Sequence, residues 1–497
     1  MIRVFNIRKG FACNSSSVHS PVIIPGGAED FDVESQEFGW DHFTAGSKRA
    51  KLHWLGHAVS HVLPLNDEIR RMAINGIMGI DDFSTDGYID HQSVIDLPMS
   101  FDGKGPHPEY LKEVVEFLSR DDVVILGGSD QDDEVHPLRG KATKDVDLTP
   151  YTDRSSSPER VARKEDGYWV IFDREGGTKV RFAIGEGAVR GEKKEGQPIA
   201  RCSRTPELVD VKITDYCDGK CGYCYQGSSK YGTHASLGDI QNLVYSLKYL
   251  EVFEVAIGGG EPTLHPDFAE ILSIFRSHYI VPNFTTKRKE WLFDDGARKI
   301  LDLCGSFALS VTNEGEVDRL ICARDYIYSR GSFPDGKFCI NVVMGTVSME
   351  ALRNIAKKCR DHGVDVTLLG FKKPKRTPEE MRWFQKQPYD GWLDAVKGNY
   401  GYTRVGIDTA LAKEFQVQLD QTGVPKTLYT TEEGVFSMYI DLVDGKMGPS
   451  SYCSKKDFID IKPSTYNRDE QKYLIGTQQI QEAFDTFKAK ALKVESR

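Results

Sequence analysis

Three cysteines lie within eight residues of one short segment, "CDGKCGYC", where Cys217, Cys221 and Cys224 have the spacing C-x3-C-x2-C. Structural zinc sites use four ligands, and this segment offers no obvious fourth. Three thiolates on a tight loop can instead hold three irons of a [4Fe–4S] cluster, for which the full set is four cysteines. The missing ligand would leave one iron with an open position, which is where a substrate or cosubstrate binds at a catalytic metal site.

A second motif, "GGGEP", begins at Gly258, 34 residues after Cys224. Both motifs lie in a regular alternation of strand and helix patterns between residues 208 and 371. The strand patterns occupy 208–214, 252–258, 280–286, 306–312, 338–345 and 364–371. The helix patterns between them occupy 236–250, 266–279, 289–304, 316–331 and 348–363.

This alternation predicts a parallel sheet, curved or closed, with helices outside it. In such sheets, functional groups gather at the carboxyl ends of the strands. The cysteine segment follows the first predicted strand and "GGGEP" follows the second. Both motifs are therefore expected to face one pocket, and their position on neighbouring strand ends is stronger evidence than either motif alone.

Together, the two motifs and the six strand–helix repeats resemble the radical S-adenosylmethionine (SAM) superfamily over about residues 208–371. The aromatic Tyr223, directly before the last cysteine, adds to the likeness. The resemblance implies an α/β fold with a partial (βα)6 barrel, a [4Fe–4S] cluster on the three cysteines, and bound SAM. It also implies that SAM chelates the open iron and that an electron, from a donor such as flavodoxin or ferredoxin, cleaves SAM. The resulting 5′-deoxyadenosyl radical would then remove a hydrogen atom from the substrate.

The resemblance further implies which residues bind SAM. The "GGGEP" residues would lie along its methionine end, and Tyr223 near its adenine. Polar residues at the third and fourth strand ends would contact the carboxylate or ribose, with weaker candidates on the fifth and sixth strands. The implied set is Tyr223, Gly259, Gly260, Glu261, Pro262, Thr285, Ser310, Thr312, Asn341 and Leu369, with Thr286 and Gly370 beside two of them.

Residues 1–205 are expected to form an α+β accessory domain of unknown role around the core at 206–371. The pattern predicts a helix at 106–120, a polar loop at 127–167 and a hairpin at 168–187.

Residues 372–497 are expected to be a C-terminal extension with a hairpin at 435–453 and a final helix at 477–493. Its place in the chain resembles that of the cysteine-rich SPASM or twitch extensions of peptide-modifying radical SAM enzymes. Here the hairpin carries only Cys453, which puts an auxiliary cluster in doubt. Cys453 is a candidate catalytic residue that donates a hydrogen atom or lines the pocket.

The cysteine segment allows two other kinds of metal site. A zinc knuckle completed by His234 would leave "GGGEP" unexplained. A purely electron-carrying cluster would need a fourth cysteine, such as Cys202 or Cys453.

Two further groups of residues have alternatives of their own. His53, His57 and His61 have metal-ligand spacing on one helix face, but packed imidazoles are the favoured interpretation. Cys13 and His19 could suggest a Cys–His nucleophile, yet a Ser-rich segment containing Asn is first of all a turn or cap.

Composition limits the cellular compartments and the kinds of partner that can be expected for this protein. The 497 residues carry a net charge of −10, with a pI near 5.7, which argues against a large sequence-independent grip on nucleic acid phosphates. No apolar run approaches the ~20 residues of a membrane span, and the start shows no secretory signal. We therefore expect a cytoplasmic protein that does not enter a membrane.

The first candidate substrate is a peptide or protein side chain. The support for it is the position of the C-terminal extension and the presence of a separate N-terminal domain. The second candidate is a nucleotide or nucleic acid base, for which the basic run at 371–383, "FKKPKRTPEEMRW", is the main support. A solvated loop is the favoured interpretation of that run. The third candidate, from another class, is a non-enzymatic zinc or Fe–S binding protein.

Overall fold

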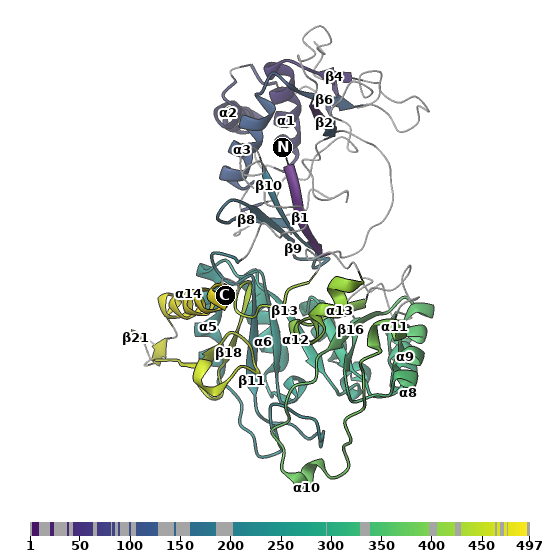
Figure 1. The fold of residues 1–497 in the computed structure, drawn as a ribbon. Helices are drawn as coiled ribbons and strands as arrows, with labels where there is room; N and C mark the ends of the chain where they lie inside the picture. Colours follow the sequence, from purple (N-terminus) through teal and green to yellow (C-terminus); the bar gives the residue numbers. More distant parts are fainter. Residues whose placement is uncertain are drawn as a thin grey trace. The chain divides into compact units, whose positions relative to one another are not determined.

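The computed structural model divides the chain into two compact units, unit 1 (Met1–Ala200) and unit 2 (Arg201–Arg497) (Figure 1). Cys13 and His19 lie outside the residues that the structure describes. The structure describes residues 2–8, 20–23, 37–38, 43–62, 67–80, 82–84, 88–89, 99–100, 106–127, 144–145, 160–184, 202–294, 296–328, 338–396, 405–422, 429–462, 465–467, 472–474 and 476–494.

In its described residues, unit 1 combines short, mainly antiparallel sheets with helices, as an α+β fold. One sheet has the order β1-β10-β9-β8, a second β4-β6-β2-β7, and β3 pairs with β5. The expected helix and the expected hairpin β9–β10 are confirmed. The strands are β1 (Ile2–Arg8), β2 (Ser20–Ile23), β3 (Glu37–Phe38), β4 (Phe43–Ala45), β5 (Tyr88–Ile89), β6 (Val123–Gly127), β7 (Lys144–Asp145), β8 (Arg160–Lys164), β9 (Trp169–Asp173) and β10 (Lys179–Ile184). The helices are α1 (Lys48–Val62), α2 (Asp67–Met78) and α3 (Pro108–Leu118).

The expectation of a polar loop at 127–167 is wrong at 144–145 and 160–164, which form β7 and β8. Residues 128–143 and 146–159 lie outside the described part of the chain. The sequence "RVARK" reads as polar, but the Arg163 Nε lies 2.6 Å from Glu165 Oε1 and both side chains are fully buried. This pairing neutralises the buried charge of Arg163 with that of Glu165, which directly follows the strand.

Two of the three histidines, His53 and His57, are packed side chains of α1, as favoured from the sequence; the side chain of His61 lies outside the part that the structure describes. His53 and His57 are both buried. His53 Nε2 lies 3.1 Å from Asp82 Oδ1, and the His57 ring lies 4.9 Å from the Phe83 ring. Within the described residues, no group of three His, Cys, Asp or Glu side chains could hold a metal ion.

Unit 2 is built on one ten-stranded sheet with the order β17-β16-β15-β14-β13-β12-β11-β18-β19-β20. All pairs from β17 to β18 are parallel, and β19 and β20 continue the sheet antiparallel. The six expected strands are confirmed as β11 to β16. The strands are β11 (Leu208–Thr214), β12 (Glu254–Gly259), β13 (Val281–Thr286), β14 (Phe307–Ser310), β15 (Phe338–Val343), β16 (Asp365–Leu369), β17 (Val405–Ile407), β18 (Ser437–Asp441), β19 (Lys446–Gly448) and β20 (Ile459–Asp460).

Residues 372–497 share this sheet. They supply β17 at one edge and β18, β19 and β20 beyond β11 at the other. The boundary expected at residue 371 therefore falls inside a compact unit. A further hairpin, β21 (Thr465–Asn467) with β22 (Lys472–Leu474), stands outside the sheet.

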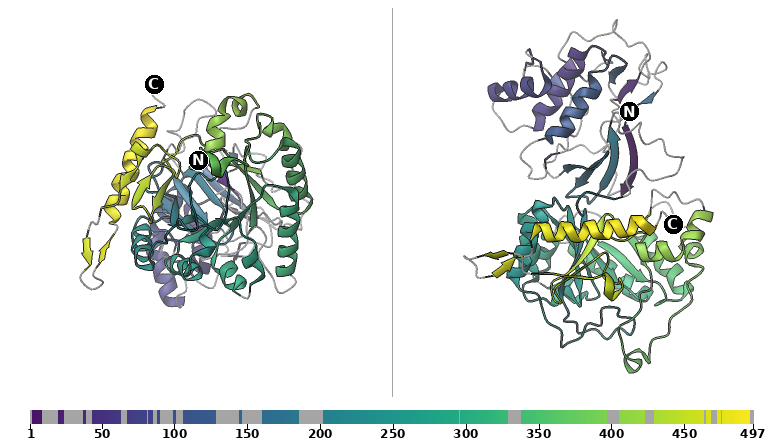
Figure 2. Two further views of the ribbon diagram at one scale, coloured as in Figure 1. Left: turned by 90° about the horizontal axis from the view of Figure 1, so that it is seen from below. Right: turned by 60° about the vertical axis from the view of Figure 1, so that its left-hand side comes forward.

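The helices of unit 2 lie outside the curved sheet (Figure 2). Ser236 caps α5, because its hydroxyl accepts a hydrogen bond from the Asp239 N–H at 3.1 Å. The single helix expected at 289–304 is instead a short 3-10 helix and α7, separated at Gly296, a residue of low helix propensity. The helices are α5 (Leu237–Tyr249), α6 (Phe268–Ser277), α7 (Ala297–Leu303), α8 (Glu314–Tyr328), α9 (Met349–Asp361), α10 (Pro378–Met381), α11 (Trp392–Val396), α12 (Thr409–Glu414), α13 (Gln416–Gln421) and α14 (Thr477–Val494), with 3-10 helices η3 (Pro262–Leu264), η4 (Glu290–Phe293) and η5 (Lys455–Asp457). None of the described helices in either unit has the length and apolar character needed to cross a bilayer.

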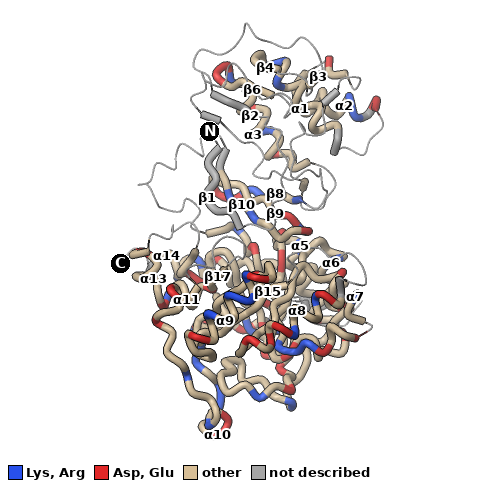
Figure 3. Tube along the Cα trace, turned by 90° about the vertical axis from the view of Figure 1, so that its right-hand side faces the viewer, with Lys and Arg blue, Asp and Glu red and all other residues tan. Residues whose placement is uncertain are grey.

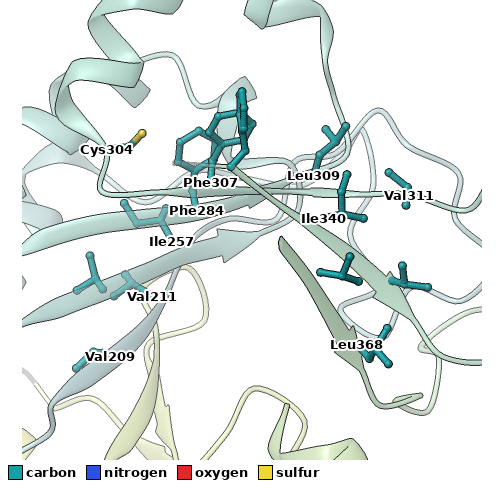
Figure 4. Packing of buried hydrophobic residues seen from close by; sticks show 14 of the residues in the cluster. Val209, Val211, Ile257, Phe284, Cys304, Phe307, Leu309, Val311, Ile340 and Leu368 are labelled. Carbon is teal, nitrogen blue, oxygen red and sulfur yellow. The ribbon is translucent and has the colours of Figure 1, made fainter. Parts of the chain in front are cut away.

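The two faces of the sheet differ because strand side chains alternate between them. The outer face is apolar and packs against the helices, as Figure 4 shows for Val211, Ile257, Phe284 and Phe307. The Phe284 and Phe307 rings stack with centroids 5.6 Å apart. The inner face, opposite the helices, carries polar residues at the alternate positions, among them Asp210, Lys212, Thr214, Glu254, Asn283, Thr285, Ser310, Asn341 and Thr367.

Side-chain contacts demonstrate how strongly the sheet curves. The Lys372 ammonium, just after β16, lies 4.6 Å from the centre of the Tyr452 ring, just after β19. Seven strand spacings separate β16 from β19, or about 34 Å in a flat sheet. The sheet must therefore bend until its two ends approach each other, which makes it a partial barrel.

Candidate cofactor site

The cysteine loop follows the carboxyl end of β11 and folds back on itself. The Cys217 N–H donates to the Ser229 carbonyl at 3.0 Å, and the Ser229 N–H donates to the Asp215 carbonyl at 3.2 Å. Within the loop, the Cys224 N–H donates to the Cys221 carbonyl at 3.2 Å. These bonds hold the three cysteines on one short arch at the mouth of the barrel.

The thiols of this arch are close enough to influence one another. Burial raises the pKa of Cys217 to about 11, opposed by a hydrogen bond from the Gly219 N–H, and the charges of Glu261, Cys221 and Cys224 raise it further. A Cβ atom added at Gly219 would lie 3.3 Å from Cys217 Sγ and 3.9 Å from Cys221 Sγ. The glycine thus leaves a small cradle between two of the thiols.

The donor set fits a cluster better than a single ion. Among the described residues, no three potential ligands converge on one ion position. In a [4Fe–4S] cluster each cysteine binds a different iron, so three thiolates that do not converge on one point fit this group. The geometry does not support the interpretation as a zinc knuckle, because no three His, Cys, Asp or Glu side chains of the described residues are placed to hold one metal ion. His234 is engaged elsewhere: its Nδ1 lies 2.9 Å from Thr214 Oγ1, and its ring lies 4.9 Å from the His265 ring.

The glycines of "GGGEP" bring the end of β12 against the cysteine loop. The Gly260 N–H donates to the Thr214 carbonyl at 2.7 Å, and the Glu261 N–H donates to the Tyr216 carbonyl at 2.9 Å. A Cβ atom at Gly260 would lie 2.2 Å from the Tyr216 carbonyl oxygen, and Gly259 has φ +120°. Only glycine fits these two positions, because the backbones of the two motifs touch.

The Glu261 carboxylate organises the neighbouring strand end. Its Oε1 accepts from the Thr286 hydroxyl at 2.7 Å and from the Thr263 hydroxyl at 2.7 Å. Its Oε2 accepts from the Lys287 N–H at 3.1 Å. The side chain is buried, and its hydrogen bonds join the end of β12 to the end of β13. A ligand at this turn would therefore meet backbone groups. Pro262, also buried, begins the 3-10 helix η3.

The structure brings some of the predicted polar residues together and engages others elsewhere. The Asn341 amide donates to Thr285 Oγ1 at 3.4 Å, and Ser310 pairs with Asn341 in the sheet register. In contrast, Thr312 donates from its N–H and hydroxyl to Glu316 Oε2, at 2.6 Å and 3.2 Å. The Leu369 carbonyl accepts from the Met344 N–H at 2.8 Å. Thr285, Ser310 and Asn341 therefore form a group on the inner face.

Tyr223 has a partner that the sequence did not suggest. The Lys287 ammonium lies 3.3 Å from the Tyr223 hydroxyl and 3.6 Å from Cys221 Sγ. Burial raises the pKa of Tyr223 to about 12, and the charge of Cys221 adds to this while Lys287 opposes it. The position of Lys287, directly after the third strand, was the available signal. Lys287 places a positive charge beside one cysteine of the loop, Cys221.

Deeper on the inner face lies a group of charges that sequence reasoning also missed, here called the lumen cluster: Asp210, Lys372, Asp408, Glu433 and Tyr452. Lys372 Nζ lies 3.4 Å from Asp408 Oδ2, and the Tyr452 hydroxyl donates to Glu433 Oε1. Burial is the main cause that raises the pKa of Asp210 to about 6 and that of Glu433 to about 7. The alternation in "LVDVKIT", with polar residues every second position, was the signal for the first member.

Cys453 lies against Gly448, the last residue of β19. Its Sγ would lie 3.1 Å from a Cβ at Gly448, and burial raises its pKa, with Asp457 and Lys490 as the nearby charges. In the part of the chain that the structure describes, its neighbours Ser451 and Tyr452 make the inward contacts, Ser451 with the Tyr225 hydroxyl at 3.0 Å.

Comparison with known proteins agrees with this geometry. Residues 211–387 match the family model described as the radical SAM superfamily. This chain is similar to the mycofactocin maturase MftC of Mycobacterium ulcerans (strain Agy99), 34% identical over 82 residues, which are 16% of this chain and 22% of that protein. It is also similar to the GTP 3′,8-cyclase of Actinobacillus pleuropneumoniae serotype 5b (strain L20), 35% identical over 85 residues, which are 16% of this chain and 25% of that protein. The matches thus span about a quarter or less of these relatives' lengths.

Among solved structures, Streptococcus suis SuiB bound to S-adenosylmethionine is similar with 16% identity and a TM-score of 0.41, covering 59% of this chain and 82% of that chain. Residues 211–387, with their partial barrel and cysteine loop, form a radical SAM domain. The expected family and fold class are confirmed.

Proposed function

We propose that this protein is a radical SAM enzyme that acts on a peptide or protein side chain. The cysteine loop supports the first half of the proposal, because it carries three thiols on one short arch after β11 and Gly219 leaves a cradle between two of them, Cys217 and Cys221. When bound, the cluster and SAM supply hydrogen-atom abstraction from an unactivated position. The chain's own part is to hold these groups, orient the substrate and exclude water.

The residues around the loop have distinct roles in this proposal. Cys217, Cys221 and Cys224 hold the cluster. Gly259 and Gly260 allow the backbone after β12 to lie against the loop, and its carbonyl groups then face the methionine end of SAM. The inner-face group of Thr285, Ser310 and Asn341 offers hydroxyl and amide groups to the SAM carboxylate or ribose.

The lumen cluster is the observation that favours a peptide over a nucleotide. Three carboxylates, Asp210, Asp408 and Glu433, surround one ammonium, Lys372. A polyanionic substrate would be repelled by excess negative charge in a partly buried site. A neutral or cationic side chain would not be repelled, and the MftC relative is a maturase.

A nucleotide substrate is the second candidate, since GTP 3′,8-cyclases are also among the relatives. The basic run at 371–383 was the sequence feature in its favour. Two of its charges are committed: Lys372 is paired with Asp408, and the Arg376 side chain, only 8% exposed, hydrogen-bonds to backbone carbonyls. This weakens the argument for a phosphate-binding rim.

Two partners belong to the proposal as well. A small redox protein such as flavodoxin or ferredoxin would deliver the electron. Unit 1 would bind a part of the peptide that is distant from the reacting residue, which would leave unit 2 to bind the reacting side chain.

SAM cleavage is the first test. The full chain is reconstituted with iron and sulfide without oxygen, SAM and dithionite are added, and 5′-deoxyadenosine is measured by mass spectrometry. We expect the product from the wild type and its loss in Cys221→Ala. Cys322→Ala is the matched control, because Cys322 is an exposed cysteine of α8. A cluster that forms without any product, even with peptides or nucleotides added, would contradict the proposal.

Substrate class is tested in the same assay. A pool of synthetic peptides should raise the rate of 5′-deoxyadenosine formation, and a mixture of nucleoside triphosphates should not. The reverse result would favour the nucleotide candidate.

A further inference from the structure

The segment that follows β16 passes over the cysteine loop and holds it by its backbone. We call residues 371–384 the loop clamp. The Lys375 N–H donates to the Cys224 carbonyl at 3.0 Å. The Arg376 side chain donates from Nε to the Cys221 carbonyl at 3.2 Å and from Nη2 to the Ser228 carbonyl at 2.8 Å. The clamp therefore binds the carbonyl groups of two of the three cysteines.

Arg376 is fixed in the orientation that this requires. Its side chain is 8% exposed, and its Nη1 lies 3.2 Å from Glu380 Oε1. Glu380 is itself held at the start of α10, because its other oxygen accepts from the Thr377 N–H at 2.8 Å and Thr377 caps the helix in return. The capping box thus anchors the carboxylate that orients the guanidinium.

Packing supports the same contact. A Cβ atom at Gly222, between Cys221 and Tyr223, would lie 2.7 Å from the Phe384 Cβ. The Phe384 ring lies 5.6 Å from the Tyr223 ring and stacks with Phe371 at 5.9 Å. Figure 3 shows the basic residues along the segment that leads to α10.

We propose that Arg376 is a positioning residue for the cluster: it fixes the cysteine loop in its ligand geometry by binding the Cys221 and Ser228 carbonyls on either side of Cys224. This inference rests on the proposed function in one respect, namely that the three cysteines hold a cluster. In this proposal Arg376 acts through the loop, by its hydrogen bonds to two backbone carbonyl groups, and is not itself a ligand of the cluster. A planar guanidinium can donate to both carbonyl groups at once. A lysine ammonium at the same position could reach only one of them, and would hold it less precisely.

The test compares Arg376→Gln and Arg376→Lys with the wild-type full chain and with Arg382→Gln. Arg382 lies in the same clamp, but it is exposed and its guanidinium lies over the Trp383 ring at 5.1 Å. Three quantities are measured: the rate at which a chelator removes iron from the reconstituted protein, the electron paramagnetic resonance spectrum of the reduced cluster, and the rate of alkylation of each cysteine in the iron-free protein.

We expect about tenfold faster iron release in Arg376→Gln, since groups that orient metal ligands typically contribute 10–100-fold to metal affinity. We also expect an altered spectrum, and several-fold faster alkylation of Cys221 and Cys224 in the iron-free variant. The exposed Cys322 serves as the internal reference, and its alkylation rate should not change. Arg376→Lys should fall between the variant and the wild type, and Arg382→Gln should match the wild type.

Unchanged iron release and unchanged alkylation in Arg376→Gln would overturn the proposal. Faster alkylation of every cysteine, Cys322 included, would also overturn it, because it would show general unfolding rather than loss of a local clamp. If Arg376→Gln does not fold, the same comparison in Arg376→Lys decides. If the wild type takes up no iron, the proposed function fails, while the alkylation rates of the iron-free proteins still decide whether Arg376 holds the loop.

Discussion

The ammonium of Lys212 lies 2.9 Å from the carboxylate of Asp441, and the two residues face each other in register across β11 and β18. Asp215 and Asp444 also lie near the same ammonium, at 2.8 Å and 3.3 Å. Lys212 is buried. This ion-pair group joins the strand that carries the cysteine loop to a strand more than two hundred residues later in the chain.

Replacing Lys212 should destabilise unit 2 strongly. Lys212→Met would leave Asp441 buried beside two other carboxylates without a counter-charge, a loss of about 3–5 kcal/mol. Urea unfolding at pH 7 measures it, with Lys446→Met as the control because Lys446 is exposed on the next strand, β19. Equal stability of the two variants would show that the ion-pair group contributes little.

Two neighbouring glycines should respond differently to alanine. Gly260→Ala places a methyl group 2.2 Å from the Tyr216 carbonyl oxygen, so the two motifs must separate, at a cost of about 1–3 kcal/mol and with loss of iron. A Cβ at Gly258 meets nothing within 4 Å.

Gly258→Ala should therefore keep its stability and its iron, and only the affinity for SAM should fall, because the methyl group enters the inner face where SAM would lie. Calorimetric titration of the reconstituted protein with SAM measures this. An unchanged affinity for SAM would show that SAM does not bind against this part of β12.

The lumen cluster should make stability depend on pH. The pKa of Glu433 is raised to about 7 from its ordinary 4.5, so between these values the folded state binds more protons than the unfolded state. The free energy of unfolding should then fall as the pH rises through this window. Relative to Glu433→Gln, the wild type should lose about 2–3 kcal/mol between pH 5 and pH 8. Glu432→Gln is the neighbouring control. If the free energies of unfolding of the wild type and Glu433→Gln change in parallel with pH, the raised pKa of Glu433 is contradicted.

Cys453 provides a test of the auxiliary cluster. Since its contacts are with Gly448 and Ser450, Cys453→Ala should leave the iron content of the reconstituted protein unchanged. Iron and sulfide analysis measures this. A loss of about four irons per chain would show that Cys453 belongs to a second cluster.

The sequence was sufficient for the regular part of the fold. Strands β11 to β16 alternate with amphipathic helices, and their apolar positions match the face that packs against those helices. The strands at the two ends of the sheet were harder to foresee. The segments of β17 and β20 are only three and two residues long, and the place of β18 beside β11 depends on contacts between residues distant in sequence.

The site followed the same division. The cysteines and the glycines could be identified from their spacing and residue type, because binding of iron requires thiolates and close backbone contact requires glycine. Lys287, Arg376 and Glu433 are ordinary surface types in the sequence. Their importance comes from three-dimensional contacts with the Cys221 thiol, the Cys221 carbonyl and the Tyr452 hydroxyl, which no local pattern encodes.

The pairing of β11 with β18 also sets an order of events during synthesis. β11 ends at Thr214, but its second neighbour in the sheet ends only at Asp441. Until the ribosome has made that strand, β11 is an edge with unpaired backbone groups and the charge of Lys212 lacks the carboxylate opposite it. The clamp residues 371–384 also emerge well after the cysteines that they hold. Iron loading should accordingly come late in synthesis, after the residues up to Asp441 have left the ribosome.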